Sequence, residues 1–304
     1  MRQVLAVVGP TASGKTALAI EAALRLDTEI VSADSMQFYR GMEIGTGAPE
    51  PAELARVKHH FIGHLDPSEE ISAGAYAEVA RREVVTLNNA GRTAVVVGGS
   101  GLYIQALIDG IFDGPARDPA IRERLDAQAA AEGSKVLHSR LAEIDPAYAT
   151  RIDSMDLRRI VRGLEVFEIT GRPLSVLHAE QGGHSFDAQW VAVNYPRPEL
   201  YDRINRRVDA MFEVGFVAEL EALVASGYEE HILRLKSLGY REVLGYLRGE
   251  STLDKAVETM KMNTRRYAKR QLIWFRADTR LQWLDPNALE TVSFQMKQRL
   301  AART

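Results

Sequence analysis

Short runs of apolar residues recur in the first hundred positions, and each is followed by glycine or small polar residues. The run Val4–Val8 ends at Gly9 and precedes an alanine-rich helical pattern over Thr16–Leu26. The segments Glu29–Ser32 and Thr93–Val97 have the same strand-like character. A buried strand that leads into a helix is how a parallel sheet begins. The pattern therefore predicts an α/β fold, with functional loops at the carboxyl ends of the strands.

From Arg117 to about Leu177 the pattern changes to helical periods with charged faces, and no strand-like run occurs. A strand signal returns at Gln189–Val193. We therefore expect a P-loop-type parallel sheet core, flanked by helices and formed by residues 1–114 and 187–304, with a helical insertion domain at 115–186. Helices are predicted at 120–131, 136–141 and 156–169 in the insertion and at 199–226, 239–248 and 253–277 after it, with a last strand at Leu281–Leu284.

Composition narrows the possible functions. Of the 304 residues, 46% are apolar and 26% are charged, which excludes collagen-like, coiled-coil and wholly disordered chains. Cysteine is absent, so disulfides, thiolate metal sites and cysteine nucleophiles are excluded. The net charge is only -3, so a nucleic-acid partner must be bound by local basic patches. No apolar run is long enough for a signal peptide or a membrane span, and we expect a cytoplasmic monomer without a membrane partner.

The strongest chemical signal is a complete G-x-x-x-x-G-K-[ST] motif between a predicted strand and a predicted helix. Its glycines let backbone N–H groups surround phosphate oxygens, and the helix N-terminus adds partial positive charge. Lys15 adds a full positive charge, and the Thr16 hydroxyl is a candidate ligand for Mg²⁺. The motif predicts a polyphosphate site without identifying the polyphosphate. The predicted diphosphate-binding residues of this loop are Gly9, Pro10, Thr11, Ala12, Ser13, Gly14, Lys15 and Thr16.

The carboxylate expected of a simple nucleotide hydrolase is missing from the strand at Thr93–Val97, which ends in Gly98-Gly99. The strand at Glu29–Ser32 is instead followed by Asp34. An acid beside the phosphate loop can act as a general base or reach the water shell of a metal. An aspartate that caps a turn or helix is the alternative interpretation.

Other motifs occur in a fixed order after the phosphate loop. They are Asp34-Ser35-Met36-Gln37 with Tyr39, Gly45-Thr46, His59-His60, Asp66-Pro67, Gly98 to Tyr103, Arg158 to Glu165, Leu200 to Asp209, Gly239 to Glu242 and Thr264 to Gln271. Together they resemble the tRNA dimethylallyltransferase family, also called tRNA isopentenyltransferases, in its bacterial form. The resemblance runs from residue 4 to about 276. The chain departs from the family pattern at Glu43, at Gly47-Ala48, where a lysine is usual, and at Ser154-Met155.

The resemblance implies transfer of a dimethylallyl group from its diphosphate to N6 of adenosine 37 in tRNAs that read codons beginning with U. It implies release of diphosphate with help from Mg²⁺, and it makes Asp34 the base. Lys15, Thr16 and Ser100 are the other predicted catalytic residues, and Ser100 stands where threonine is usual. The partners are dimethylallyl diphosphate and the anticodon stem-loop of tRNA. The predicted tRNA contacts are Asp34, Ser35, Met36, Gln37, Ser100, Arg122, Arg158, Arg159, Arg162, Gly239, Tyr240, Arg265, Arg266, Lys269 and Arg270.

Two features of the sequence indicate a phosphate-rich ligand independently of the family resemblance. Between positions 255 and 280 there are eight basic residues against two acidic ones, so this segment is the favoured polyanion contact. Arg203 and Arg207 share one face of a predicted helix and could both turn toward the diphosphate, although a solvated or ion-paired face is equally open. A prenyltransferase for free nucleotides and an RNA-binding nucleotidase are the alternative functions.

Overall fold

The computed structural model describes residues 3–110, 114–180 and 186–286. The chain divides into two compact units, one formed by Met1–Ile108 with Ser185–Thr304 and the other by Asp109–His184. In the described residues the first unit contains the sheet and the second unit is helical. Each helix in the described ranges is too short or too polar to span a bilayer.

The described part of the first unit contains a six-stranded sheet with the order β3-β2-β4-β1-β5-β6. Every neighbouring pair is parallel, which confirms the predicted fold class. The short strand β3 escaped the sequence prediction because two residues carry no usable periodicity. The strands are β1 (Gln3–Val8), β2 (Ile30–Ser32), β3 (His59–His60), β4 (Ala94–Gly98), β5 (Asp187–Val193) and β6 (Leu281–Leu284).

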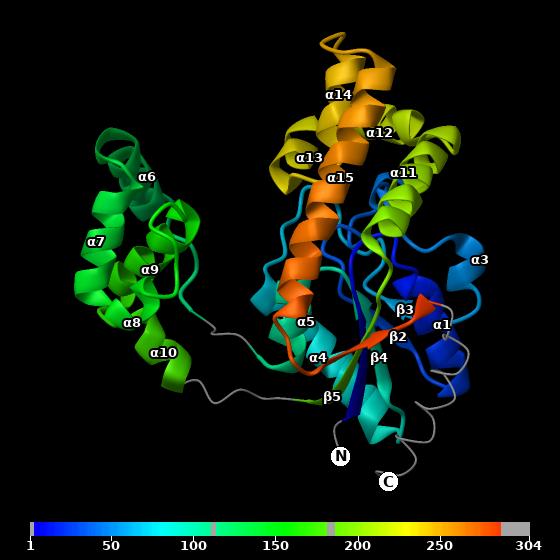
Figure 1. Cartoon of the computed structure of the whole chain (residues 1–304), viewed down its shortest axis with the longest axis horizontal. Helices are drawn as coiled ribbons and strands as arrows, with labels where there is room; N and C mark the ends of the chain where they lie inside the picture. Colours follow the sequence, from blue (N-terminus) through cyan, green and yellow to red (C-terminus); the bar gives the residue numbers. More distant parts are fainter. Residues whose placement is uncertain (1–2, 111–113, 181–185, 287–304) are drawn as a thin grey trace. The chain divides into compact units, whose positions relative to one another are not determined.

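Both faces of the sheet are buried, which explains the nearly continuous apolar strands. Val4 and Ala6 of β1 belong to one hydrophobic cluster, and Leu5 and Val7 belong to another on the opposite face. The helices α4 (Ala73–Asn89) and α5 (Gly101–Ile108) pack into the first cluster, and α1 (Lys15–Arg25) packs into the second. Figure 1 shows helices on both sides of the strands. Our sequence analysis did not predict α4.

Two long helices, α11 and α15, lie side by side in the first unit and extend together from the sheet (Figure 1). They are antiparallel, because Arg265 donates to Asn205 Oδ1 at 2.6 Å and Lys261 Nζ lies 2.7 Å from Asp209 Oδ1. The single helix predicted at 199–226 is wrong, because Gly215, at a φ of 106°, separates two helices. Besides α1, α4 and α5, the helices in the described part of this unit are α2 (Glu43–Thr46), α3 (Pro51–Leu54), α11 (Arg197–Glu213), α12 (Phe216–Ala225), α13 (Glu229–Leu235), α14 (Tyr240–Leu247) and α15 (Leu253–Arg276).

The second unit has its own core, formed by leucine, isoleucine, valine and alanine from its helices. Aspartates determine where two of the helices begin: Asp118 accepts the N–H groups of Ala120 and Ile121, and Asp156 accepts that of Arg159. The helices of this unit are α6 (Pro119–Glu132), α7 (Ser134–Ile144), α8 (Pro146–Ala149), α9 (Leu157–Thr170) and α10 (Leu174–Glu180).

Candidate active site

The loop between β1 and α1 has the backbone geometry of an anion site. Gly9 and Gly14 have φ angles of 143° and 78°, and Ala12 also lies in the left-handed region at 62°. A non-glycine residue in that region is strained, and such strain gathers at functional sites. Gly14 precedes α1 without a side-chain cap, so the first N–H groups of this helix are available to an anion.

Two polar side chains of this loop, those of Ser13 and Lys15, are buried. Ser13 is 1% exposed, and its hydroxyl has no hydrogen-bond partner among the described residues. Burial lowers the pKa of Lys15 to about 8, with Arg207 acting in the same direction and the Asp34 carboxylate opposing it. Buried polar groups are normally satisfied, so this hydroxyl and the buried Lys15 ammonium together suit an anionic ligand.

Asp34 directly follows β2, and its loop lies against the loop that follows β4. Gly98 permits this close approach, because a Cβ there would lie 2.3 Å from the carbonyl oxygen of Ala33. The Ser35 N–H donates to Ser100 Oγ at 3.1 Å, and the two hydroxyl oxygens are also 3.1 Å apart. Ser100 therefore fixes the segment that carries the predicted base.

Helix α15 joins these two loops to the phosphate loop. The Gln271 side chain accepts the Thr11 N–H at 3.0 Å and donates to the Gly99 carbonyl at 2.9 Å. A Cβ at Gly99 would lie 2.4 Å from the Gln271 amide nitrogen, so a side chain there would displace this amide from its two hydrogen bonds. Burial raises the pKa of Tyr267, as does the charge of Asp34, while hydrogen bonds to Ser100 and Gln271 oppose the rise. Our sequence analysis assigned no role to Gln271 or Tyr267.

Arg203 and Arg207 of α11 both reach the site, as expected for residues four positions apart on one helix face. Arg203 Nε donates to the Ala12 carbonyl at 2.9 Å, so this guanidinium supports the phosphate loop. Arg207 donates to the Gly47 carbonyl at 2.7 Å, and burial lowers its pKa while Asp34 raises it. A Cβ at Gly47 would lie only 1.8 Å from Arg207 Nη2, so this departure from the family pattern makes room for the guanidinium.

A cavity of about 300 Å³ connects these parts within the first unit. The phosphate loop and Asp34 line the same space, together with apolar side chains that our sequence analysis could not name. The lining residues are Thr11, Ala12, Asp34, Ser35, Met36, Gly45, Thr46, Ile204, Arg207, Val208, Met211, Leu235, Lys236, Ser237, Leu238, Met260, Thr264, Tyr267, Arg270 and Gln271.

Gly239 and Tyr240 lie in the core, and the Tyr240 ring is not exposed at the surface of this structure. Tyr240 is 1% exposed, its hydroxyl lies 2.7 Å from Glu219 Oε1, and its ring packs edge-on against Phe216. A Cβ at Gly239 would lie 2.7 Å from the sulfur of Met260. In the structure these two residues therefore support the cavity wall, and their contact with tRNA stays a prediction.

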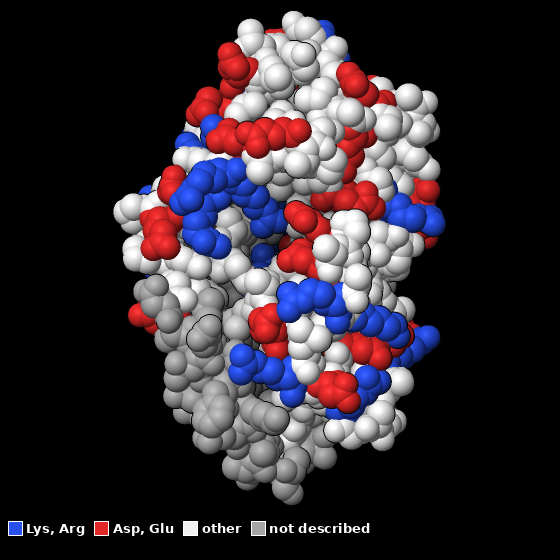
Figure 2. Space-filling view, turned by 90° about the vertical axis from the view of Figure 1, so that its right-hand side faces the viewer, with Lys and Arg blue, Asp and Glu red and all other residues white. Residues whose placement is uncertain are grey.

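The predicted basic segment forms an exposed face of α15. Arg266, Lys269 and Arg270 are exposed, and none has an ion-pair partner among the described residues, whereas Arg265 is held by Asn205. On the face drawn in Figure 2, Lys and Arg form separate groups with Asp and Glu between them. The near-neutral net charge thus hides local groups of positive charge.

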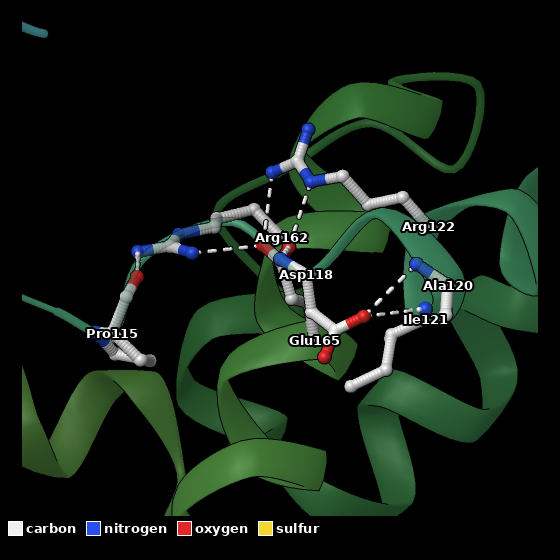
Figure 3. A network of polar contacts seen from close by, with 7 residues as sticks. All are labelled: Pro115, Asp118, Ala120, Ile121, Arg122, Arg162 and Glu165. Atoms are coloured by element: carbon white, nitrogen blue, oxygen red, sulfur yellow. Dashed lines mark hydrogen bonds and ion pairs between the residues drawn. The ribbon is translucent and has the colours of Figure 1, made fainter.

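In the second unit, the buried carboxylate of Glu165 binds two of the predicted tRNA-binding arginines, Arg122 and Arg162 (Figure 3). Glu165 accepts Arg122 Nε at 2.7 Å, Arg162 Nη1 at 2.8 Å and the Asp118 N–H at 3.0 Å. Burial alone would raise the pKa of Glu165, but the hydrogen bonds from Arg122 and Arg162 lower it to about 2. Both guanidiniums therefore have fixed positions. Our sequence analysis assigned no role to Glu165.

The other two arginines of α9 lie on its surface. Arg158 and Arg159 are both exposed, and Arg159 forms an ion pair with Asp156 at 3.4 Å. Arg158 has no ion-pair partner among the described residues, which leaves its charge available to a polyanion.

Fold and site together define an enzyme that acts on a phosphorylated substrate with an apolar part. The family model described as IPP transferase matches residues 37–278. The tRNA dimethylallyltransferase of Desulfosudis oleivorans is 48% identical over 299 residues, which are 97% of this chain and 95% of the relative. That of Geobacter sulfurreducens is 43% identical over 94% of this chain and 93% of the relative. The chain belongs to the IPP transferase family, which confirms the resemblance found in its sequence.

Solved structures lead to the same family. The full-length tRNA isopentenylpyrophosphate transferase of Bacillus halodurans has a TM-score of 0.73 and 36% identity, covering 99% of this chain and 98% of that one. A eukaryotic dimethylallyltransferase, crystallised acting on tRNA, has a TM-score of 0.76 and 26% identity, covering 99% of this chain and 78% of that one.

Proposed function

We propose that this protein transfers a dimethylallyl group from dimethylallyl diphosphate to N6 of adenosine 37 in tRNAs that read codons beginning with U. The observation that carries the proposal is a cavity lined by Thr11 and Ala12 of the phosphate loop, by Asp34 and by apolar side chains. Such a cavity suits a donor with an anionic head and an apolar tail. The same proposal includes action as a monomer in the cytoplasm.

In the proposed reaction, a bond forms between N6 of adenine and C1 of the prenyl group while the bond from C1 to the diphosphate oxygen breaks. The electron pair of that bond leaves with the diphosphate. An exocyclic adenine amine is a weak nucleophile, so a base must remove its proton as the new bond forms. Asp34 takes this proton, since its carboxylate lines the cavity and its loop is fixed through Ser35 and Ser100.

Charge that develops on the leaving diphosphate is stabilised by fixed donors around it. The N–H groups at the start of α1, the Ser13 hydroxyl and the Lys15 ammonium supply these donors. The apolar wall keeps water away from the allylic carbon, whose developing cation would otherwise be hydrolysed.

The residues of the loop also fit Mg²⁺. The Thr16 hydroxyl, in the first turn of α1, is a hard oxygen donor of the kind that Mg²⁺ prefers. No cluster of three or more His, Cys, Asp or Glu occurs in the described residues, so we assign most of the ligands to diphosphate oxygens and water. When bound, Mg²⁺ would supply additional positive charge to the leaving group.

One assay tests the proposed function. The full-length protein is mixed with unmodified tRNA, Mg²⁺ and labelled dimethylallyl diphosphate, and the digested tRNA is analysed for prenylated adenosine at position 37. Label in free adenylate instead of tRNA would favour a small-nucleotide enzyme. RNA-stimulated nucleotide hydrolysis without prenyl transfer would favour a nucleotidase.

The pH dependence of donor use follows from Lys15. Its pKa of about 8 in the free protein means that the ammonium is lost as pH rises through this value. The charged form binds diphosphate, so we expect kcat/KM for the donor to fall about tenfold per pH unit above pH 8. Steady-state rates from pH 6 to 10 measure this, and a profile that stays flat to pH 10 would contradict it.

Removal of positive charge from the exposed face of α15 should weaken tRNA binding. We expect the Lys269→Ala and Arg266→Ala double variant to bind tRNA several-fold less tightly at low salt. The slope of log Kd against log salt should also fall by about one for each cation removed. Arg82→Ala, an exposed cation of α4 that pairs with Glu78 and lies outside this basic segment, is the control. Equal salt slopes for all variants would show that this face does not contact tRNA.

A further inference from the structure

The cavity lies between α11 and α15, and its lining residues can be ordered along these two helices. The pairs Asn205–Arg265 and Asp209–Lys261 fix the antiparallel register, because the residue numbers of each pair add to 470. In this register the lining residues of one helix face those of the other at successive levels. Within one or two residues of this register, Ile204 lies at the level of Tyr267, Val208 at that of Thr264, and Met211 at that of Met260.

One end of this series is polar. Beyond Tyr267, Gln271 binds the Thr11 N–H of the phosphate loop, and beyond Ile204, Arg203 binds the Ala12 carbonyl. The diphosphate head of a donor must therefore lie at this end, and its tail must extend toward the methionine level.

The other end is lined mainly by apolar side chains, with Lys236 and Ser237 between two leucines. The Met260 side chain packs against Gly239, where a Cβ would lie 2.7 Å from both its sulfur and its methyl carbon. Leu235 and Leu238 line the cavity there as well. Side chains of a helix lean toward its N-terminus, so Met211 extends back toward the phosphate loop.

The part of the cavity between the levels of Tyr267 and Met260, which we call the slot, has a length that suits one isoprene unit. Tyr267 and Met260 are seven residues apart, which is about 10 Å along the helix axis. A dimethylallyl group reaches about 4 Å from its reactive carbon, and each further isoprene unit adds about 5 Å. A five-carbon tail therefore ends well short of the methionine level, whereas a ten-carbon tail, at about 9 Å, reaches the side chains of Met211 and Met260.

We propose that Met211 and Met260 together determine the chain length of the prenyl donor, by closing the slot beyond five carbons. This inference rests on the proposed function and goes beyond it. Neither residue takes part in bond making; both act as a wall that a longer tail would have to displace.

The experiment compares dimethylallyl diphosphate with geranyl diphosphate as donors, using the full-length protein, unmodified tRNA and Mg²⁺. The variants are Met211→Ala, Met260→Ala and the double variant. Met262→Ala is the matched control, since Met262 belongs to α15 but is not among the described residues that line the cavity. We expect the ratio of kcat/KM for geranyl to dimethylallyl diphosphate to rise at least about tenfold in the cavity variants and less than about twofold in the control.

The outcomes separate the two proposals. Variants that keep dimethylallyl transfer but still exclude geranyl diphosphate would overturn the methionine wall and leave the proposed function intact. A wild-type protein that transfers no dimethylallyl group would refute the proposed function itself.

A variant with a larger side chain tests the proposal even if the alanine variants destabilise the helices. Met211→Phe narrows the slot while keeping it apolar. We expect it to raise KM for dimethylallyl diphosphate at least about tenfold, with tRNA affinity within about twofold of wild type. An unchanged KM for this donor would overturn the proposal.

Discussion

Replacement of Asp34 by alanine should reduce prenyl transfer to tRNA by about 10² to 10⁴-fold, the usual contribution of a positioned general base. The carboxylate lines the cavity that also holds the phosphate loop, so its loss removes the group that takes the adenine proton. Because Ser100 holds this loop through the Ser35 N–H, the backbone should keep its place. Binding of tRNA should therefore change by less than about threefold. Single-turnover transfer with enzyme in excess, together with tRNA binding by filter retention, measures both effects.

Asp34→Asn refines this test, because the amide keeps the shape of the side chain and cannot accept the proton as a carboxylate does. It should be about as inactive as the alanine variant. Asp254→Ala, an exposed carboxylate in the first turn of α15, is the control and should retain full activity. Turnover of either Asp34 variant at the wild-type rate would reject Asp34 as the base.

Replacement of Lys15 by alanine should lower kcat/KM for dimethylallyl diphosphate by about 10² to 10³-fold, the typical cost of losing one fixed transition-state donor. The ammonium is 7% exposed beside the unpartnered Ser13 hydroxyl, so no water or neighbouring cation can replace it fully. Affinity for tRNA should remain within about twofold, which distinguishes a defect in donor binding from misfolding. Steady-state kinetics with varied donor, and thermal unfolding of the variant, are the measurements.

The control is Lys58→Ala, an exposed lysine that pairs with Glu29 at the edge of the sheet, outside the cavity lining. It should leave donor kinetics unchanged. If Lys15→Ala has wild-type kinetics with the donor, the phosphate loop does not hold the diphosphate.

The sequence was sufficient to predict the parts of the site that are local in the chain. The strand, loop and helix around Lys15 form one continuous motif, so spacing alone predicts their geometry. The strand that carries Asp34 was equally clear, because buried parallel strands are nearly continuous apolar runs. The parallel sheet followed from these local units.

Contacts between distant segments were not predictable in the same way. Gln271 lies 260 residues from Thr11, and nothing in its helical surroundings indicates that its side chain binds two loops of the sheet. Glu165 likewise looks like any charged residue of an amphipathic helix until the fold buries it beneath Arg122 and Arg162. Aromatic residues were ambiguous for a related reason: Tyr240 is as suited to stacking on a base as to core packing, and only the structure shows that it is buried.

The bond between Gln271 and the phosphate loop has a consequence for biosynthesis. The segments that contain Lys15 and Asp34 leave the ribosome early, whereas the amide that ties Thr11 to Gly99 belongs to α15, more than 200 residues later in the chain. A nascent chain can thus fold much of its sheet before the donor site is complete. Competence to bind the donor proposed above should therefore appear only after α15 has been synthesised.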